Sequence, residues 1–197
     1  MSAVPAKREV ILNAAEAQFS QYGFRRTTMD DIARAAEVSR ASLYSYFENK
    51  EEIFRSLSQW LFAESLQAAR DELQCQRDTN HLEQRLIAGL SAFHARLLGA
   101  LEATPHGAEL MEEGGRLNAD ITQEYAVQIE ALLAFEVAHA QQSGEIDLGA
   151  ANLSAEAAAE VIHLAALGLK HGTTSFADYQ VKLGQLLPLV IAGLKKA

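Results

Sequence analysis

The sequence predicts an all-α protein of about nine helices. Valine, isoleucine and threonine nowhere alternate with polar residues over the length of a strand, whereas alanine, leucine, glutamate and glutamine dominate the chain. The 197 residues include only three prolines. Hydrophobic residues make up 49% and charged residues 22% of the sequence, which is the balance of a globular protein with a substantial core. We therefore expect a packed helical fold.

The first two helices are expected close together near the N-terminus. Apolar residues recur at offsets of three and four over about residues 6–22, and Gly23 ends this helix in a left-handed conformation. Thr27 or Thr28 then caps a short second helix, whose first turn carries two aspartates that complement the helix dipole.

A third short helix follows a break at residues 37–39. Ser39 is placed to cap it, and Leu43 and Phe47 give it an inward face. Two short helices joined by a tight break, and buttressed by a preceding helix, form the arrangement that inserts the second helix into the major groove of DNA. The sequence therefore predicts a helix-turn-helix domain over residues 1–50.

The remainder, residues 51–197, is expected to form a larger helical domain. Gly114 and Gly115 are expected to end one helix in a flexible joint, and residues 143–152 form the longest expected loop. The helices are expected at about residues 49–78, 82–101, 104–115, 117–142 and 154–170, and in a last helix that carries Leu183–Leu194. The core face of the helix at 117–142 is predicted to comprise Ile121, Tyr125, Ile129, Leu132 and Phe135.

Charge is distributed unevenly between the two parts. The total formal charge of −9 argues against a nucleic-acid partner, because neutralising phosphates requires a local surplus of lysine and arginine. Residues 1–50, however, carry seven basic and six acidic groups, a charge of +1, and the rest carries −10. A DNA-reading end attached to an acidic body fits this asymmetry, although compositional scatter alone can also produce it.

The outward face of the third helix is polar and aromatic. It offers a guanidinium and hydroxyl groups, which suit base edges and phosphates, from Arg40, Ser42, Tyr44, Ser45 and Tyr46. At about residues 7–60 the chain resembles the DNA-binding domain of the tetracycline-repressor (TetR) family. The resemblance is carried above all by Thr27-Thr28-Met29-Asp30-Asp31-Ile32-Ala33, Val38-Ser39 and Leu43-Tyr44-Ser45-Tyr46-Phe47-Glu48-Asn49-Lys50-Glu51-Glu52.

The resemblance implies a dimeric, ligand-responsive repressor and assigns DNA contacts, with Ser39 as the helix cap. It implies base contacts by Arg40, Ala41, Ser42, Tyr44 and Ser45, and phosphate contacts by Thr28, Tyr46 and Lys50. Two residues depart from the family pattern: Glu37 stands where a turn glycine is usual, and Ala41 where glycine is frequent. Glu37 is therefore expected to adopt a left-handed conformation that costs about 1 kcal/mol, and we expect Glu37→Gly to stabilise the fold.

Dimerisation follows from the motif, because one short helix contacts few bases and a tight reader needs two half-sites about 34 Å apart. By the resemblance, the last two long helices form a four-helix bundle with a second copy; a purely internal core is the alternative. The expected interface residues are Ala158, Val161, Ile162, Ala165, Leu183, Leu187, Val190, Ile191 and Leu194.

The resemblance also implies that the middle helices enclose a pocket for a small, largely apolar effector. Its candidate lining residues, each of which can equally be plain core, are Phe62, Phe93, His94, Leu97, Leu101, Met111, Tyr125, Ile129 and Phe176. We favour a repressor that the effector releases from DNA. A co-repressor-dependent regulator and an activator remain alternatives, because the sequence does not give the sign of the response.

Other classes of protein find little support. The chain has no His-x-x-x-His pair, no glycine-rich phosphate loop and no cysteine cluster, so we expect no enzyme, no metal and no cofactor. A helical adaptor that keeps the motif only for packing is the remaining alternative. Cys75, the single cysteine, is expected to be buried. No apolar stretch approaches the roughly 20 residues of a membrane span, and we expect a cytoplasmic protein.

Overall fold

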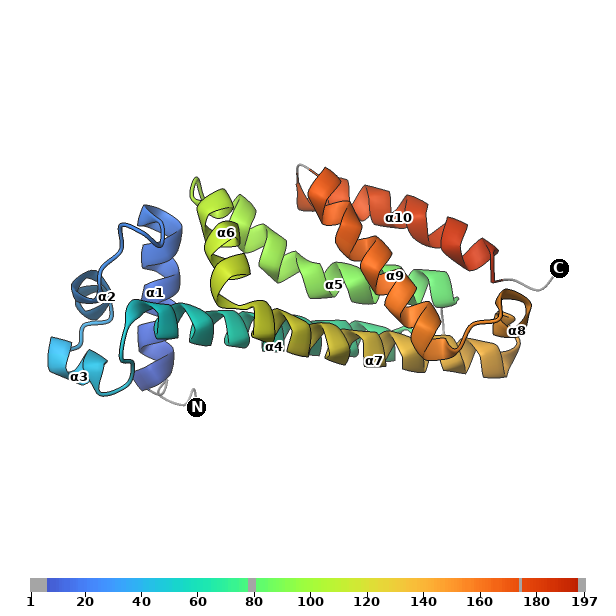
Figure 1. Cartoon of the computed structure of the whole chain (residues 1–197), viewed down its shortest axis with the longest axis horizontal. Helices are drawn as coiled ribbons and strands as arrows, with labels where there is room; N and C mark the ends of the chain where they lie inside the picture. Colours follow the sequence, from blue (N-terminus) through green and yellow to red (C-terminus); the bar gives the residue numbers. More distant parts are fainter. Residues whose placement is uncertain (1–6, 78–80, 174, 195–197) are drawn as a thin grey trace. The chain divides into compact units, whose positions relative to one another are not determined.

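The computed structural model of the chain describes residues 7–77, 81–173 and 175–194, without the side chains of Ala150 and His171. All regular secondary structure in these ranges is helical (Figure 1), which confirms the predicted fold class. The α-helices are α1 (Lys7–Tyr22), α2 (Met29–Ala35), α3 (Arg40–Tyr44), α4 (Lys50–Cys75), α5 (Leu82–Glu102), α6 (Gly107–Leu117), α7 (Ala119–Ser143), α8 (Leu148–Ala151), α9 (Ala155–Leu169) and α10 (Phe176–Ala192). Nine of them correspond to predicted helices, and the four-residue α8 lies within the expected loop. Over the same ranges, no helix combines the length and the apolar composition that a bilayer span needs.

The chain divides into two compact units, at other positions than the expected boundary after residue 50. The first unit ends at Phe62 and also takes in Gly99–Thr122, which include α6. The second unit consists of Ala63–Leu98 and the chain from Gln123 onward. Helices α4, α5 and α7 therefore contribute residues to both units, and α6 belongs to the same unit as the predicted helix-turn-helix.

Three phenylalanines form the centre of the first unit's core. The ring centroids of Phe19 on α1, Phe24 in the following turn and Phe54 on α4 lie 5.5, 5.6 and 5.1 Å apart in the three pairs. Tilted and edge-on pairs at this spacing stabilise a core beyond their buried area. Leu43 and Phe47 are 0% and 1% exposed, so the third helix has the inward face that the sequence predicts. This core holds α1, α2 and α3 beside the first turns of α4 (Figure 1).

Gly23 ends α1 as predicted. Its φ of 81° lies in the left-handed region, and its N–H donates to the carbonyl of Phe19 at 2.9 Å. A residue with a β-carbon would be strained here, because L side chains rarely adopt this φ, and Oε2 of Glu109, which would lie 2.5 Å from that carbon, would have to shift.

In the second unit, a buried ion network joins three helices. Glu136 on α7 is 1% exposed, and its two carboxylate oxygens accept from Nε of Arg77, in the turn after α4, and Nε of Arg85 on α5, each at 3.1 Å. Loss of either partner would leave a buried carboxylate short of compensating charge, which is strongly destabilising. The network therefore fixes the relative positions of α4, α5 and α7 within this unit.

The expected flexible joint at Gly114 and Gly115 is wrong. Helix α6 continues through both glycines and ends at Leu117. Two glycines in a helix interior cost about 2 kcal/mol relative to alanine. The preceding Glu113 binds Arg25 of the helix-turn-helix at 3.0 Å, a tertiary contact that the helical path of α6 positions.

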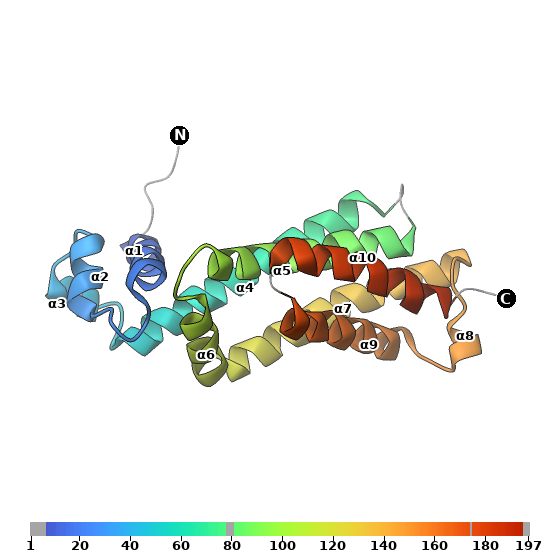
Figure 2. The ribbon, with the colours of Figure 1, turned by 90° about the horizontal axis from the view of Figure 1, so that it is seen from above.

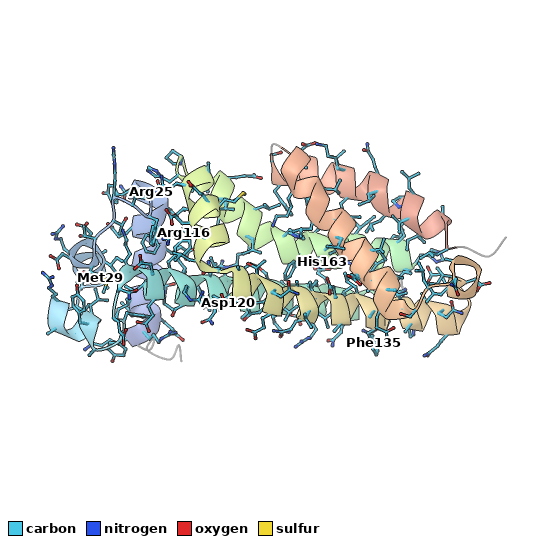
Figure 3. The ribbon with its side chains drawn as sticks, viewed as in Figure 1. Arg25, Met29, Arg116, Asp120, Phe135 and His163 are labelled. Atoms are coloured by element: carbon cyan, nitrogen blue, oxygen red, sulfur yellow. The ribbon has the colours of Figure 1, made fainter. Side chains whose placement is uncertain are left out.

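Two expectations about single side chains are also wrong. Phe135, predicted for the core face of α7, is 56% exposed and lies at the outer edge of that helix (Figure 3), whereas Leu133 and Val137 are fully buried. Apolar residues occupy both sides of α7 at this point, so their spacing alone did not identify the inward face. Cys75, at the end of α4, is exposed rather than buried.

Candidate nucleic-acid interface

Side-chain caps fix the two short helices of the motif. Oγ1 of Thr28 accepts from the N–H of Asp31 at 3.2 Å, and the Asp31 carboxylate accepts from the N–H of Thr28 at 3.1 Å. The hydrogen bonds from Thr28 hold the pKa of Asp31 below its ordinary value. Oγ of Ser39 accepts from the N–H of Ser42 at 3.1 Å, which confirms Ser39 as the cap of α3. These bonds satisfy N–H groups that a helix start leaves unpaired.

Glu37 makes the turn between the two helices in a left-handed conformation. Its φ is 55°, as expected for a residue that stands at a position where glycine is usual. The turn is held by main-chain bonds from Glu37 to Arg34 at 3.2 Å and from Val38 to Ala33 at 3.0 Å. The Glu37 side chain is exposed.

Helix α3 and the turn that follows it present outward the residues that the sequence predicts for this face. Tyr44 and Tyr46 are 42% and 41% exposed. Arg40, Ala41 and Ser45 are exposed as well, and Ser42 is half-buried. The surface thus offers a guanidinium, phenols and hydroxyls, which are donors that suit phosphates and base edges.

Lys50, predicted as a phosphate contact, binds carbonyl groups of its own domain. Its Nζ donates to the carbonyls of Phe24 at 2.7 Å and Thr27 at 2.9 Å, and lies 3.4 Å from that of Arg25. The ammonium is also 4.4 Å from the Phe24 ring centroid, and partial burial lowers the pKa of Lys50. Lys50 therefore fastens the start of α4 to the turn before α2, and a phosphate would have to compete with these acceptors.

Three glutamates of α6 converge on Arg25, in the same turn before α2. The N–H of Arg25 donates to Glu109 at 2.7 Å, and its guanidinium lies 2.9 Å from Glu112 and 3.0 Å from Glu113. Arg116 binds the other oxygen of Glu113 at 2.8 Å, and hydrogen bonds from Arg116 and Arg25 lower the pKa of Glu113. The sequence analysis missed this link, because its partners lie more than 80 positions apart.

The candidate effector residues are divided between the two units. Phe62, Leu101 and Met111 belong to the first unit, and Met111 is 54% exposed. The second unit contains Phe93, His94, Leu97, Tyr125, Ile129 and Phe176. A surface hollow of about 220 Å³ in that unit contains none of them; it is lined by Arg70, Leu73, Gln74, Arg77, Leu132, Phe135 and Glu136.

His94 forms a buried polar pair with Tyr179. Oη of Tyr179 and the carbonyl of Leu90 each lie 3.0 Å from Nδ1 of His94. Burial lowers the pKa of His94 to about 3 and raises that of Tyr179, so both groups are uncharged at neutral pH. Phe93 packs edge-on against His94, and Phe176 is stacked on Tyr179. The sequence analysis missed Tyr179, whose one signal is its position three residues after Phe176.

Most of the predicted interface residues lie in the chain's own core. At most 6% of the surface is exposed for Ala158, Ile162, Leu183, Leu187, Ile191 and Leu194. Ala165 and Val190 are half-buried, and Val161 is 52% exposed. Helices α9 and α10, which lie side by side (Figure 2), do leave apolar side chains outside. These are Val161, Leu164, Val181 and Leu189, with exposures of 52%, 54%, 61% and 75%.

Together, these features define an all-helical protein with an N-terminal helix-turn-helix. Residues 11–57 match the family model of bacterial regulatory proteins, tetR family. This segment therefore resembles the DNA-binding domain of the tetR family, and the resemblance seen in the sequence is confirmed for this domain.

Individual relatives resemble the chain over different lengths. The "Probable acrEF/envCD operon repressor" of Escherichia coli (strain K12) is 38% identical over 87 residues, which are 42% of this chain and 39% of that protein. SmeT, the repressor of the Stenotrophomonas maltophilia multidrug efflux pump SmeDEF, is 25% identical, with a TM-score of 0.67 over 97% of this chain and 91% of SmeT. A transcriptional regulator from Cytophaga hutchinsonii ATCC 33406 shares the fold, with 17% identity and a TM-score of 0.75 over 98% and 100% of the two chains. The chain spans between about a quarter and two fifths of the length of the curated relatives that it matches, which are regulators rather than enzymes.

Proposed function

We propose that the chain is a transcriptional repressor that binds a palindromic DNA operator as a homodimer and is released by a small, largely apolar effector. The outward face of α3 and of the turn after it carries the proposal, because Arg40 and Tyr44 on the capped helix and Tyr46 in the turn are exposed within a segment that matches the tetR-family model. The E. coli and S. maltophilia relatives are named as repressors. Such a protein acts in the cytoplasm, where the bacterial chromosome lies.

Selection from genomic DNA tests this function. Sheared genomic fragments are incubated with the full chain, and the retained fragments are sequenced. We expect enrichment of an inverted repeat whose half-sites lie about one helical turn, or a multiple of it, apart. The double variant Arg40→Ala, Tyr46→Ala removes only exposed side chains and should abolish enrichment. A helical adaptor or an enzyme would enrich no sequence.

The dimer is proposed to form through the exposed apolar surface of α9 and α10. A second copy that packs the same two helices against Val161, Leu164, Val181 and Leu189 would complete a four-helix bundle. The fully buried Leu187 belongs to the monomer's core, so that a charge there would unfold the chain and not report on the interface.

Leu164→Asp and Leu189→Asp test the dimer. Each places a charge in the proposed interface, and light scattering after gel filtration should show monomers. Val127→Asp is the matched control, because Val127 is also apolar and 56% exposed but lies on α7. Dimers of all three variants would refute this interface.

The effector is proposed to act through α6. This helix binds Arg25, three residues before the cap of α2, through Glu109, Glu112 and Glu113. A ligand that favours another position of α6 would move the start of α2 and with it α3. Only a difference in ligand affinity between the two positions can drive this change.

We propose that the neutral pair of His94 and Tyr179, which packs against Phe93 and Phe176, supplies the few polar contacts of a largely apolar ligand.

Release assays test this coupling and show whether the effector weakens or strengthens DNA binding. Small apolar compounds are titrated onto the preformed operator complex of the wild type, of Arg25→Ala and of Arg26→Ala. Arg26→Ala removes an equal, exposed charge one residue away. We expect all three proteins to bind operator, and only Arg25→Ala to need more compound for release. Equal release of the two variants would refute a route through Arg25, and tighter binding with compound would indicate a co-repressor or an activator.

A further inference from the structure

An ion pair joins the two helices of the motif at the residue predicted to read a base. Oδ2 of Asp30, in the first turn of α2, lies 3.2 Å from Nη1 of Arg40, the first residue of α3. The guanidinium also lies 5.6 Å from the ring centroid of Tyr44. Both charged side chains remain open to solvent, with exposures of 66% for Arg40 and 53% for Asp30. Arg40 is therefore held by a carboxylate and a ring while it still faces outward.

The geometry of the pair leaves the base-reading edge of Arg40 available. A guanidinium has five donors in a rigid plane. The bond to Asp30 uses Nη1, so the edge formed by Nε and Nη2 can still donate two parallel hydrogen bonds. The major-groove edge of guanine presents a matching pair of acceptors, N7 and O6. Asp30 can thus remain bound while Arg40 binds a guanine.

The neighbouring carboxylate, that of Asp31, has a different role. Asp31 accepts from Thr28 and lies 3.3 Å from Arg34, all on its own helix. Of the two aspartates, Asp30 is the one that pairs with Arg40 on α3. Its negative charge offsets that of Arg40 and repels a phosphate that approaches the same guanidinium.

We propose that Asp30 determines operator specificity by holding Arg40 in position for a guanine and by making Arg40 a poor contact for phosphates. The inference rests on the proposed DNA binding. Asp30 is a positioning residue and need not touch DNA itself. Without its charge, Arg40 is free to bind phosphate on any sequence, so the affinity for unrelated DNA rises while the preference for the operator falls.

The test compares Asp30→Asn with Glu37→Gln. Both remove one exposed negative charge from the same motif, but only Asp30 is paired with Arg40. Affinities for the selected operator and for a scrambled duplex are measured at several salt concentrations. For Asp30→Asn we expect the operator preference to fall about fivefold or more, and the salt slope on scrambled DNA to steepen by about 0.9, the value of one phosphate contact. Glu37→Gln should change both duplexes by the same factor and leave the slope unchanged.

The Arg40→Ala background separates positioning from net charge. There, Asp30→Asn should no longer alter the operator preference. If Asp30→Asn and Glu37→Gln have the same effect on both duplexes, Asp30 contributes only net charge and the inference fails while the proposed function stands. If the wild type prefers no sequence, the proposed function and the inference fail together.

Discussion

Glu37→Gly relieves strain at a single exposed turn residue, and its effect on stability can be worked out from the backbone. An L-residue in the left-handed region, such as Glu37 at φ 55°, loses roughly 1 to 2 kcal/mol against a right-handed one. Glycine avoids this loss, but it adds about 0.4 to 1 kcal/mol of entropy to the unfolded chain. The N–H bond to Arg34 is main-chain and survives the change. The middle values of the two ranges, about 1.5 less about 0.7 kcal/mol, leave a net gain of about 0.8 kcal/mol.

Fluorescence of the single tryptophan measures this gain. Trp60 packs against the core of the helix-turn-helix unit, so thermal unfolding followed at Trp60 reports on that unit. A gain of this size raises Tm by about 1 to 4 °C. Glu37→Ala is the control, because it removes the charge but keeps the β-carbon and hence the strain. A Tm at or below that of the wild type, or an equal gain in Glu37→Ala, would refute the reasoning.

Two further variants test buried contacts. Lys50→Met removes the ammonium that binds the carbonyls of Phe24 and Thr27, and should lower the free energy of unfolding by about 2 kcal/mol in urea titrations followed at Trp60; an unchanged midpoint would mean that the clamp contributes nothing. Burial lowers the pKa of His94 from 6.5 to about 3. As the pH falls, His94 is therefore protonated in the unfolded chain at a higher pH than in the folded chain. The stability that is present above pH 6.5 is lost as the pH falls towards 3. Between pH 7 and pH 5 the loss should be about 2 kcal/mol in the wild type, measured by urea unfolding followed by circular dichroism, and should be absent in His94→Gln; an equal loss in both would assign the pH dependence to other groups.

The local features of the first unit could be predicted because short-range chemistry determines them. Ser39 caps α3 and Glu37 adopts a positive φ, since both follow from residue type and position in a motif of about 20 residues. The inward burial of Leu43 and Phe47 follows from helical spacing in the same way.

Long-range contacts account for most of what the sequence did not predict. Lys50 could be recognised as part of the motif, but nothing local indicated that its ammonium binds the turn at Phe24 to Thr27. Helix α6 continues through Gly114, and the neighbouring Glu113 binds the distant Arg25. Local propensity predicts a break there, and tertiary contacts override it.

The inward and outward faces of the last two helices posed a different problem. Leu187 and Leu189 are equally apolar, yet one is fully buried and the other is 75% exposed. A side chain buried in the monomer and one buried by a second copy produce the same hydrophobic pattern. Periodicity therefore identified helices with more than one apolar face, but it did not separate the chain's own core from the surface left for a partner.

The affinity of the full chain for DNA tests the central claim, that α3 reads sequence, most directly. Fluorescence anisotropy gives Kd for the selected duplex and for a scrambled duplex of equal length at one fixed salt concentration. The account predicts a preference of roughly a thousandfold or more for the selected duplex, with most of it lost in Arg40→Ala, Tyr46→Ala. Equal affinity of the wild type for the two duplexes would contradict the account. An unchanged preference for the selected duplex in the double variant would contradict it as well.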